Sequence, residues 1–115
     1  MPSRALAALR YALRGIGLLF GAPNIWVLTA ASLAALGAGL YFSIAALEWC
    51  AVLFAVTLVW VAEALNTALE RLTDLASPQF HPLAGKAKDI AAGAVLLSAL
   101  GAVSIGIVIF GPRLF

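Results

Sequence analysis

The chain has 115 residues, of which 64% are hydrophobic and only 10% are charged, and its mean hydropathy is +1.08. This number of polar residues is too small to coat a soluble globule. The composition therefore excludes an ordinary soluble domain and indicates a membrane protein. The net charge is +2, but the basic residues are few and spread through apolar sequence. We therefore expect no nucleic-acid partner and favour a lipid headgroup or a phosphate as the anionic ligand.

Residues 3–20 are predicted to form an amphipathic helix that lies in the membrane interface. Its apolar residues recur at spacings of three and four: Leu6, Leu9, Leu13, Ile16 and Phe20. Its arginines lie elsewhere around the helix axis: Arg4, Arg10 and Arg14. This pattern is typical of an interfacial helix, and the arginines interrupt the apolar core that a cleaved leader would need. Gly21 and Pro23 then break the helix.

Three apolar segments follow, each long enough to cross a bilayer of roughly 30 Å: residues 25–47, 49–72 and 90–110. Glu48 is expected to mark a very short turn between the first two. The third segment is expected to end at Gly111 and Pro112. We therefore predict an all-α membrane protein in one domain, residues 1–115, with a surface helix and three transmembrane helices.

The basic residues predict the orientation of these spans. Six of them flank the spans on one side: Arg4, Arg10, Arg14, Arg71, Lys86 and Lys88. Only Arg113 falls on the other side. By the positive-inside rule, the N-terminus and the loop 73–89 should be cytoplasmic. A row of small residues at four-residue spacing in the third span, which includes Ala94 and Ser98, suits close helix packing and favours a homo-oligomer.

A stripe of polar residues in the second span is the best candidate for a working site. Its members are Glu63, Asn66, Glu70 and Asp74. At about 100° per helical residue, all four project within one narrow arc. A carboxylate at membrane depth costs roughly 2.5 to 3.5 kcal/mol, so a functional role is favoured. The alternative is that the stripe forms interhelical hydrogen bonds and a solvated helix end.

Depth along the helix predicts a division of labour within the stripe. Glu63 is the deeper carboxylate, and the lower dielectric around it favours a proton-accepting general base. Glu70 lies nearer the headgroups, where it should stay ionised and bind a hard cation. Asn66 lies one turn from both and can hold either carboxylate, or a substrate hydroxyl, in register.

A second cluster precedes the third span and comprises Lys86, Lys88 and Asp89. Lysines at a cytoplasmic helix end are ordinary topology signals, which is one reading of this cluster. An acid beside two lysines and opposite an acidic stripe also suits phosphate and metal chemistry. We favour the second reading because the two clusters pair.

These residues resemble the small integral-membrane lipid kinases of prokaryotes, the diacylglycerol kinase and undecaprenol kinase family. The resemblance lies in EALNTALERLTD at residues 63–74, HPLA at 81–84 and AKDIAAGAV at 87–95. It implies a homotrimer with sites between protomers in the prokaryotic cell membrane. It further implies transfer of the γ-phosphate of ATP to a lipid hydroxyl, with Mg²⁺ as cofactor.

The resemblance also assigns roles. Glu63 would be the base toward the lipid hydroxyl, Asn66 its positioning partner, and Glu70 a ligand of Mg²⁺ and part of the ATP site. The rest of the ATP site would comprise Arg4, Tyr11, Lys88 and Asp89, with Asp74 and Lys86 in support. The chain has no Gly-rich loop ending in Lys-Ser or Lys-Thr, so an ordinary P-loop is excluded.

One position departs from the family. The family usually carries a glutamate just before the first span that joins the metal and nucleotide site, and Ala22 stands in the matching place. From the resemblance we still expect an ATP-dependent kinase of a membrane lipid alcohol. An undecaprenol-like substrate is preferred over diacylglycerol because Glu48-Trp49, LNTA at 65–68 and HPLA at 81–84 look more like the undecaprenol kinase branch. The alternative is a non-catalytic or weakly active relative. A third possibility is a proton or cation conduit lined by Glu63 and Glu70.

Overall fold

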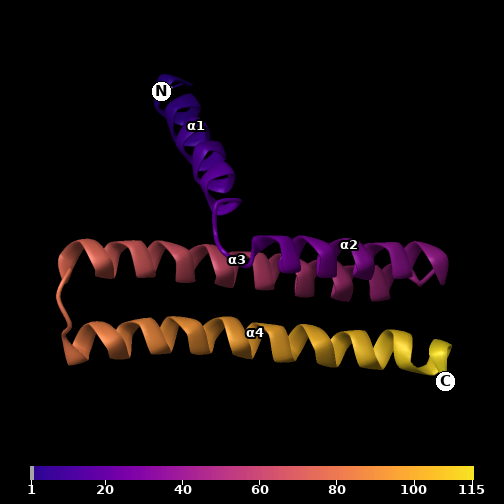
Figure 1. Cartoon of the computed structure of the whole chain (residues 1–115). Coiled ribbons are helices and arrows are strands. Elements are labelled where there is room, and N and C mark those ends of the chain that lie inside the picture. The colour runs from indigo at the N-terminus through magenta and orange to yellow at the C-terminus, as the bar shows by residue number, and fades with distance from the viewer. Residues whose placement is uncertain (1) are drawn as a thin grey trace.

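The computed structural model describes residues 2–115, which form four helices (Figure 1). They are α1 (Pro2–Leu19), α2 (Ile25–Tyr41), α3 (Ala46–Ala76) and α4 (Pro82–Leu114). The predicted all-α class is thereby confirmed. By length and composition, α3 and α4 can each cross a membrane, whereas α2 is a shorter apolar helix.

The helices differ from the predicted spans at their ends. Helix α3 already begins at Ala46, so Glu48 lies in its first turn and not in the connecting turn as predicted. The Glu48 carboxylate accepts a hydrogen bond from the backbone N–H of Ala45 (2.9 Å), which satisfies one of the free donors at the helix start. The turn itself precedes Ala45 and contains Ser43, whose φ is +50°.

Helix α4 is longer than the predicted third span at both ends. It begins at Pro82, after His81, whose Nδ1 accepts a hydrogen bond from the backbone N–H of Leu83 (3.1 Å). Proline suits the first helical position because its missing N–H would be unpaired there anyway. At the other end α4 continues past Gly111 and Pro112, where the third span was expected to end, to Leu114, since a proline this close to the end removes only one backbone bond.

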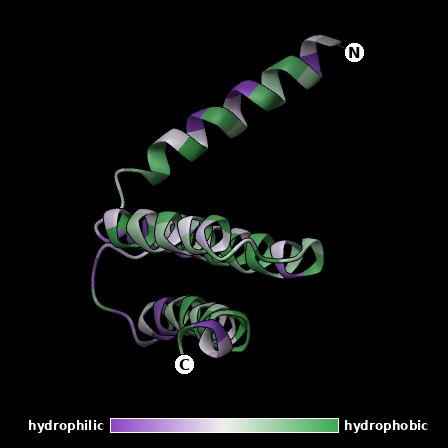
Figure 2. Ribbon diagram, turned by 90° about the vertical axis from the view of Figure 1, so that its right-hand side faces the viewer, coloured by the Kyte–Doolittle hydropathy of each residue, from purple (hydrophilic) through white to green (hydrophobic). Residues whose placement is uncertain are grey.

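The three apolar helices pack side by side, and α1 projects from them at a steep angle (Figures 1 and 2). Helices α3 and α4 are antiparallel and make the most extensive contact, while α2 runs antiparallel to the first half of α3. At 1.5 Å per residue, the 17 residues of α2 span about 26 Å, against about 47 Å for the 31 residues of α3. The C-terminal part of α3 therefore extends beyond the start of α2.

Buried residues form two small clusters at opposite ends of α2. The first comprises Leu19, Ala22 and Ile25 at the α1–α2 turn, packed against Trp60 and Ala64 of α3. The second surrounds the α2–α3 turn: Ile44, Val52 and Ile109. The first cluster holds the α1–α2 turn beside the middle of α3.

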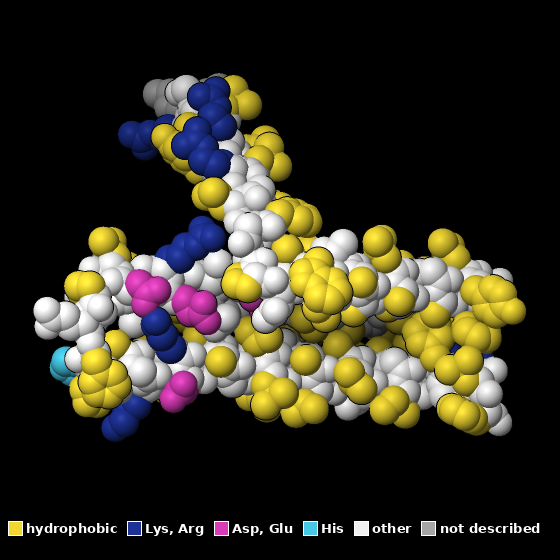
Figure 3. All heavy atoms as spheres, viewed as in Figure 1, with side chains coloured by type: hydrophobic (Ala, Val, Ile, Leu, Met, Phe, Trp, Pro, Cys, Tyr) yellow, Lys and Arg dark blue, Asp and Glu magenta, His cyan; other side chains and the backbone are white. Residues whose placement is uncertain are grey.

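Most large apolar side chains face outward instead of filling a core (Figure 3). Leu97 and Val108 on α4, for example, are 72% and 73% exposed. Soluble monomers rarely expose contiguous apolar patches of such extent. The exterior therefore matches a protein whose helices are surrounded by lipid or by other membrane helices.

Three contacts tie the helices together. Arg113 in the last turn of α4 binds both Glu48 carboxylate oxygens, at 2.9 and 3.0 Å. The indole N–H of Trp60 donates to Ser32 Oγ on α2 (2.8 Å). Near the other end of α2, the Trp49 ring lies so close to Gly39 that a Cβ there would sit 2.6 Å from a ring carbon.

Candidate functional site

The polar stripe lies on the part of α3 that extends past the start of α2. Within it, the Asn66 amide Nδ2 donates to Glu70 Oε1 at 3.2 Å. The amide oxygen of Asn66 is buried and has no hydrogen-bond partner among residues 2–115. The structure thus joins Asn66 to Glu70, and the described part of the chain shows no hydrogen bond between Asn66 and Glu63.

The stripe and the second cluster meet across α3 and α4. Lys88 Nζ forms an ion pair with Asp74 Oδ1. Lys88 lies just ahead of the apolar stretch that begins at Ile90. Its hydrogen bond to Asp74 raises the pKa of the Lys88 ammonium, and the negative charge of Glu70 raises it further. Figure 3 shows the acidic and basic side chains gathered at this end of α3 and α4. The predicted pairing of the two clusters is therefore present.

The other residues predicted for the nucleotide site stand apart within one chain. Lys86 and Asp89 are exposed on the second turn of α4. Arg4 and Tyr11 are exposed on α1, which projects away from the α3–α4 pair (Figure 1). A single chain does not bring these two residues to the stripe.

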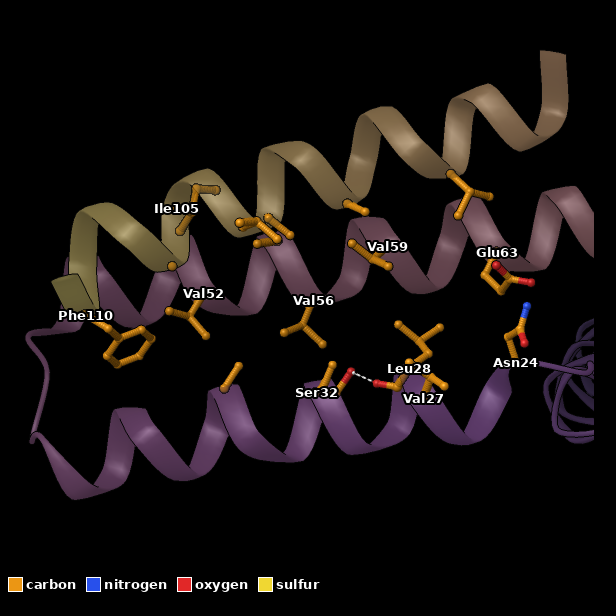
Figure 4. Close-up of a pocket in the computed structure, with 18 residues that line it drawn as sticks. Asn24, Val27, Leu28, Ser32, Val52, Val56, Val59, Glu63, Ile105 and Phe110 are labelled. Atoms are coloured by element: carbon orange, nitrogen blue, oxygen red, sulfur yellow. Dashed lines mark hydrogen bonds between the residues drawn. The ribbon is translucent and has the colours of Figure 1, made fainter. Parts of the chain in front are cut away.

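An apolar cavity of about 540 Å³ runs between α2, α3 and α4 (Figure 4). Valine, leucine and alanine side chains make up most of its wall, and Val52 and Phe110 lie toward its far end. Glu63 and Asn24 lie together at the opposite end. Glu63 thus lies where the apolar cavity meets the polar part of α3.

Sequence reasoning missed Asn24 as a site residue. In the sequence it reads as part of the break after the first helix, next to Pro23. Only the packing of the α1–α2 turn against α3 brings it to Glu63. An amide placed at the very start of an apolar helix was the one signal available.

The described residues offer few grouped donors for a metal ion. No three His, Cys, Asp or Glu side chains within residues 2–115 are grouped to hold a metal ion. Mg²⁺ does not require such a cage, because it is commonly bound through one or two carboxylates, water and substrate phosphates. The exposed carboxylate of Glu70 fits an open site of that kind. Ala22, only 5% exposed in its apolar cluster, adds no donor.

Comparison with known proteins identifies the family to which this sequence belongs. Residues 10–110 match the family model of the prokaryotic diacylglycerol kinases. The chain therefore belongs to this family, which confirms the resemblance seen in its motifs.

Three relatives illustrate the match. The chain is 40% identical over 85 residues to an undecaprenol kinase of Bacillus subtilis. The matched region covers 74% of this chain and 69% of that protein. It is 41% identical over 111 residues to a diacylglycerol kinase of Synechocystis, covering 88% of this chain but 59% of the relative. It is 42% identical over 48 residues to a diacylglycerol kinase of Escherichia coli, covering 42% of this chain and 39% of the relative.

Proposed function

We propose that this protein is a kinase that transfers the γ-phosphate of ATP to the hydroxyl of a membrane lipid alcohol. The observation that carries the proposal is the position of Glu63 between two environments. On one side lies the apolar cavity, which suits a lipid body. On the other lies the charged cluster of Glu70, Asp74 and Lys88, which suits a phosphate group and its cation.

Each residue then has a chemical task. As the lipid oxygen forms its bond to the γ-phosphorus, the bond between that phosphorus and the bridging oxygen of ADP breaks and ADP leaves. The hydroxyl proton passes to the Glu63 carboxylate, a contribution of the kind that general bases make, about 10² to 10⁴ in rate. Glu70, held by Asn66, would bind the Mg²⁺ that neutralises charge on the phosphates. Lys88, with Asp89, would contact the nucleotide.

We further propose that the protein is a homotrimer with three membrane spans per chain in the prokaryotic cell membrane. The steep angle of α1 to the other helices supports a surface position for α1 when α2, α3 and α4 cross the bilayer. The distance of α1 from the polar stripe supports a site shared between protomers. Arg4 and Tyr11 would then reach the nucleotide bound at a neighbouring copy.

An undecaprenol-like alcohol is the preferred substrate, with diacylglycerol second. At similar identity, the chain covers 69% of the relative named an undecaprenol kinase, against 59% and 39% of the two relatives named diacylglycerol kinases. The rates of phosphate transfer to the two lipids measure this preference.

Phosphate transfer from radiolabelled ATP, with each lipid in detergent micelles, tests the proposal. We expect Glu63→Gln to lower the rate at least 10²-fold because it removes the base, and Glu70→Gln to raise the Mg²⁺ concentration needed for half-maximal rate. Glu48→Gln, which removes a carboxylate at the other end of α3, is the matched control and should leave the Mg²⁺ requirement unchanged. A wild-type protein that phosphorylates neither lipid contradicts the proposal.

A weakly active or non-catalytic relative is the second candidate. It is favoured by Ala22, which stands in place of the family glutamate. Ala22→Glu distinguishes the two, since a large gain in rate would show a site that lacked only this ligand. Ala22→Gln is the control, because it adds the same bulk to the apolar cluster without the charge.

A further inference from the structure

Asn24 occupies the N-cap position of α2 but does not cap it. Asparagine in this position usually accepts a hydrogen bond from the backbone of the first helical turn. Here its φ and ψ are −105° and 16°, and its side chain makes no capping hydrogen bond. The side chain instead points toward Glu63 at the end of the cavity (Figure 4).

Asn24 and Glu63 are the polar groups of the cavity that remain available to a ligand. Among the described residues that line the cavity, Ser32 is the only other one with a polar side chain. Its hydroxyl donates to the Leu28 carbonyl (2.7 Å) and accepts from the Trp60 indole (2.8 Å), so it is already engaged. A ligand that enters with a hydrocarbon body and one polar end would place that end between Asn24 and Glu63.

We propose that Asn24 binds the hydroxyl oxygen of the lipid substrate and orients it for attack. This inference rests on the proposed kinase function. A hydroxyl has one proton to donate and two lone pairs. With the proton directed at Glu63 and one lone pair held by the Asn24 amide N–H, the second lone pair is left to attack the phosphorus. The pair of residues therefore fixes the rotation of the hydroxyl about its C–O bond.

Kinetics provide the first test. Asn24→Leu should lower kcat/KM for the lipid roughly tenfold, as expected for one lost hydrogen bond, and leave the KM for ATP unchanged. Asn24→Gln, which keeps the amide, should recover part of the loss. Thr29→Val removes a polar side chain from the same helix outside the cavity and is the control. Equal effects of Asn24→Leu and Thr29→Val would overturn the proposal.

Binding provides a second test that needs no turnover. The melting temperature in detergent is compared with hexadecanol and with hexadecane, which differ by the hydroxyl alone. We expect hexadecanol to stabilise the wild type more than hexadecane does, and Asn24→Leu to remove the difference. A difference that persists in Asn24→Leu overturns the role of Asn24. A difference lost in Asn24→Leu, with no phosphate transfer by the wild type, supports it and contradicts only the kinase function.

Discussion

The Asn66 side chain uses only part of its hydrogen-bonding capacity in one chain. Its Nδ2 is bound to Glu70, while its buried Oδ1 has no partner in the described residues. An unpaired buried acceptor costs about 1–3 kcal/mol. A donor supplied by substrate or by a neighbouring copy would recover that energy, so Asn66 favours a completed site over an empty one.

Lys88 should matter more for nucleotide binding than for folding. Its ion pair with Asp74 is solvent-accessible, at 39% and 66% side-chain exposure, and pairs of this kind contribute little to stability. Lys88→Met should therefore leave the melting temperature unchanged within about 3 °C and raise the KM for ATP several-fold. Lys86→Met is the comparison, because Lys86 lies in the same turn of α4 and forms no ion pair with the described residues. A large loss of stability in Lys88→Met would show that the pair is structural.

At the scale of helices, apolar runs predicted the number and order of the elements but not their ends. Hydropathy marks the part of a helix that suits lipid, whereas the helix itself ends where backbone hydrogen bonds end. Helix α4 therefore starts at Pro82, eight residues before the apolar run at Ile90. The pairing of Lys88 with Asp74 could be anticipated from charge, but the place of Asn24 depends on a tertiary contact that no local pattern encodes.

The packing of α2 against α3 depends on the absence of a side chain at Gly39. Because an added Cβ would lie 2.6 Å from the Trp49 ring, Gly39→Ala should destabilise the protein by about 1–3 kcal/mol. Gly37→Ala is the matched control, since its Cβ would meet nothing within 4 Å, and it should be neutral or stabilising by up to about 1 kcal/mol. Thermal unfolding in detergent measures both, and equal effects would show that the indole moves aside at no cost.

At the scale of the whole molecule, the apolar exterior indicates an apolar environment but does not indicate how many copies of the chain associate. Lipid tails and neighbouring apolar helices satisfy such a surface equally well, so composition alone does not give the number of copies. The antiparallel order of α3 and α4 does separate the two ends of the molecule. The α3–α4 loop and the α2–α3 turn lie at opposite ends.

This separation makes the membrane orientation testable. In a Cys50→Ala background, which removes the single native thiol, Gln79→Cys marks the α3–α4 loop and Ala45→Cys marks the α2–α3 turn. A membrane-impermeant maleimide should label the first only in inside-out vesicles and the second only in spheroplasts, because the basic residues favour a cytoplasmic loop. The reverse pattern would invert the topology.

The short α2 has a consequence for the lipids in which the protein works. Its length of about 26 Å is less than the roughly 30 Å hydrocarbon thickness of a typical bilayer, and a short span is accommodated by local thinning. With α2 as the proposed first span and its start on the proposed cytoplasmic side, such hydrophobic mismatch would draw the adjacent leaflet down toward Asn24 and Glu63. Vesicles made from short-chain phospholipids should therefore give faster phosphate transfer than vesicles made from long-chain ones, at equal substrate mole fraction.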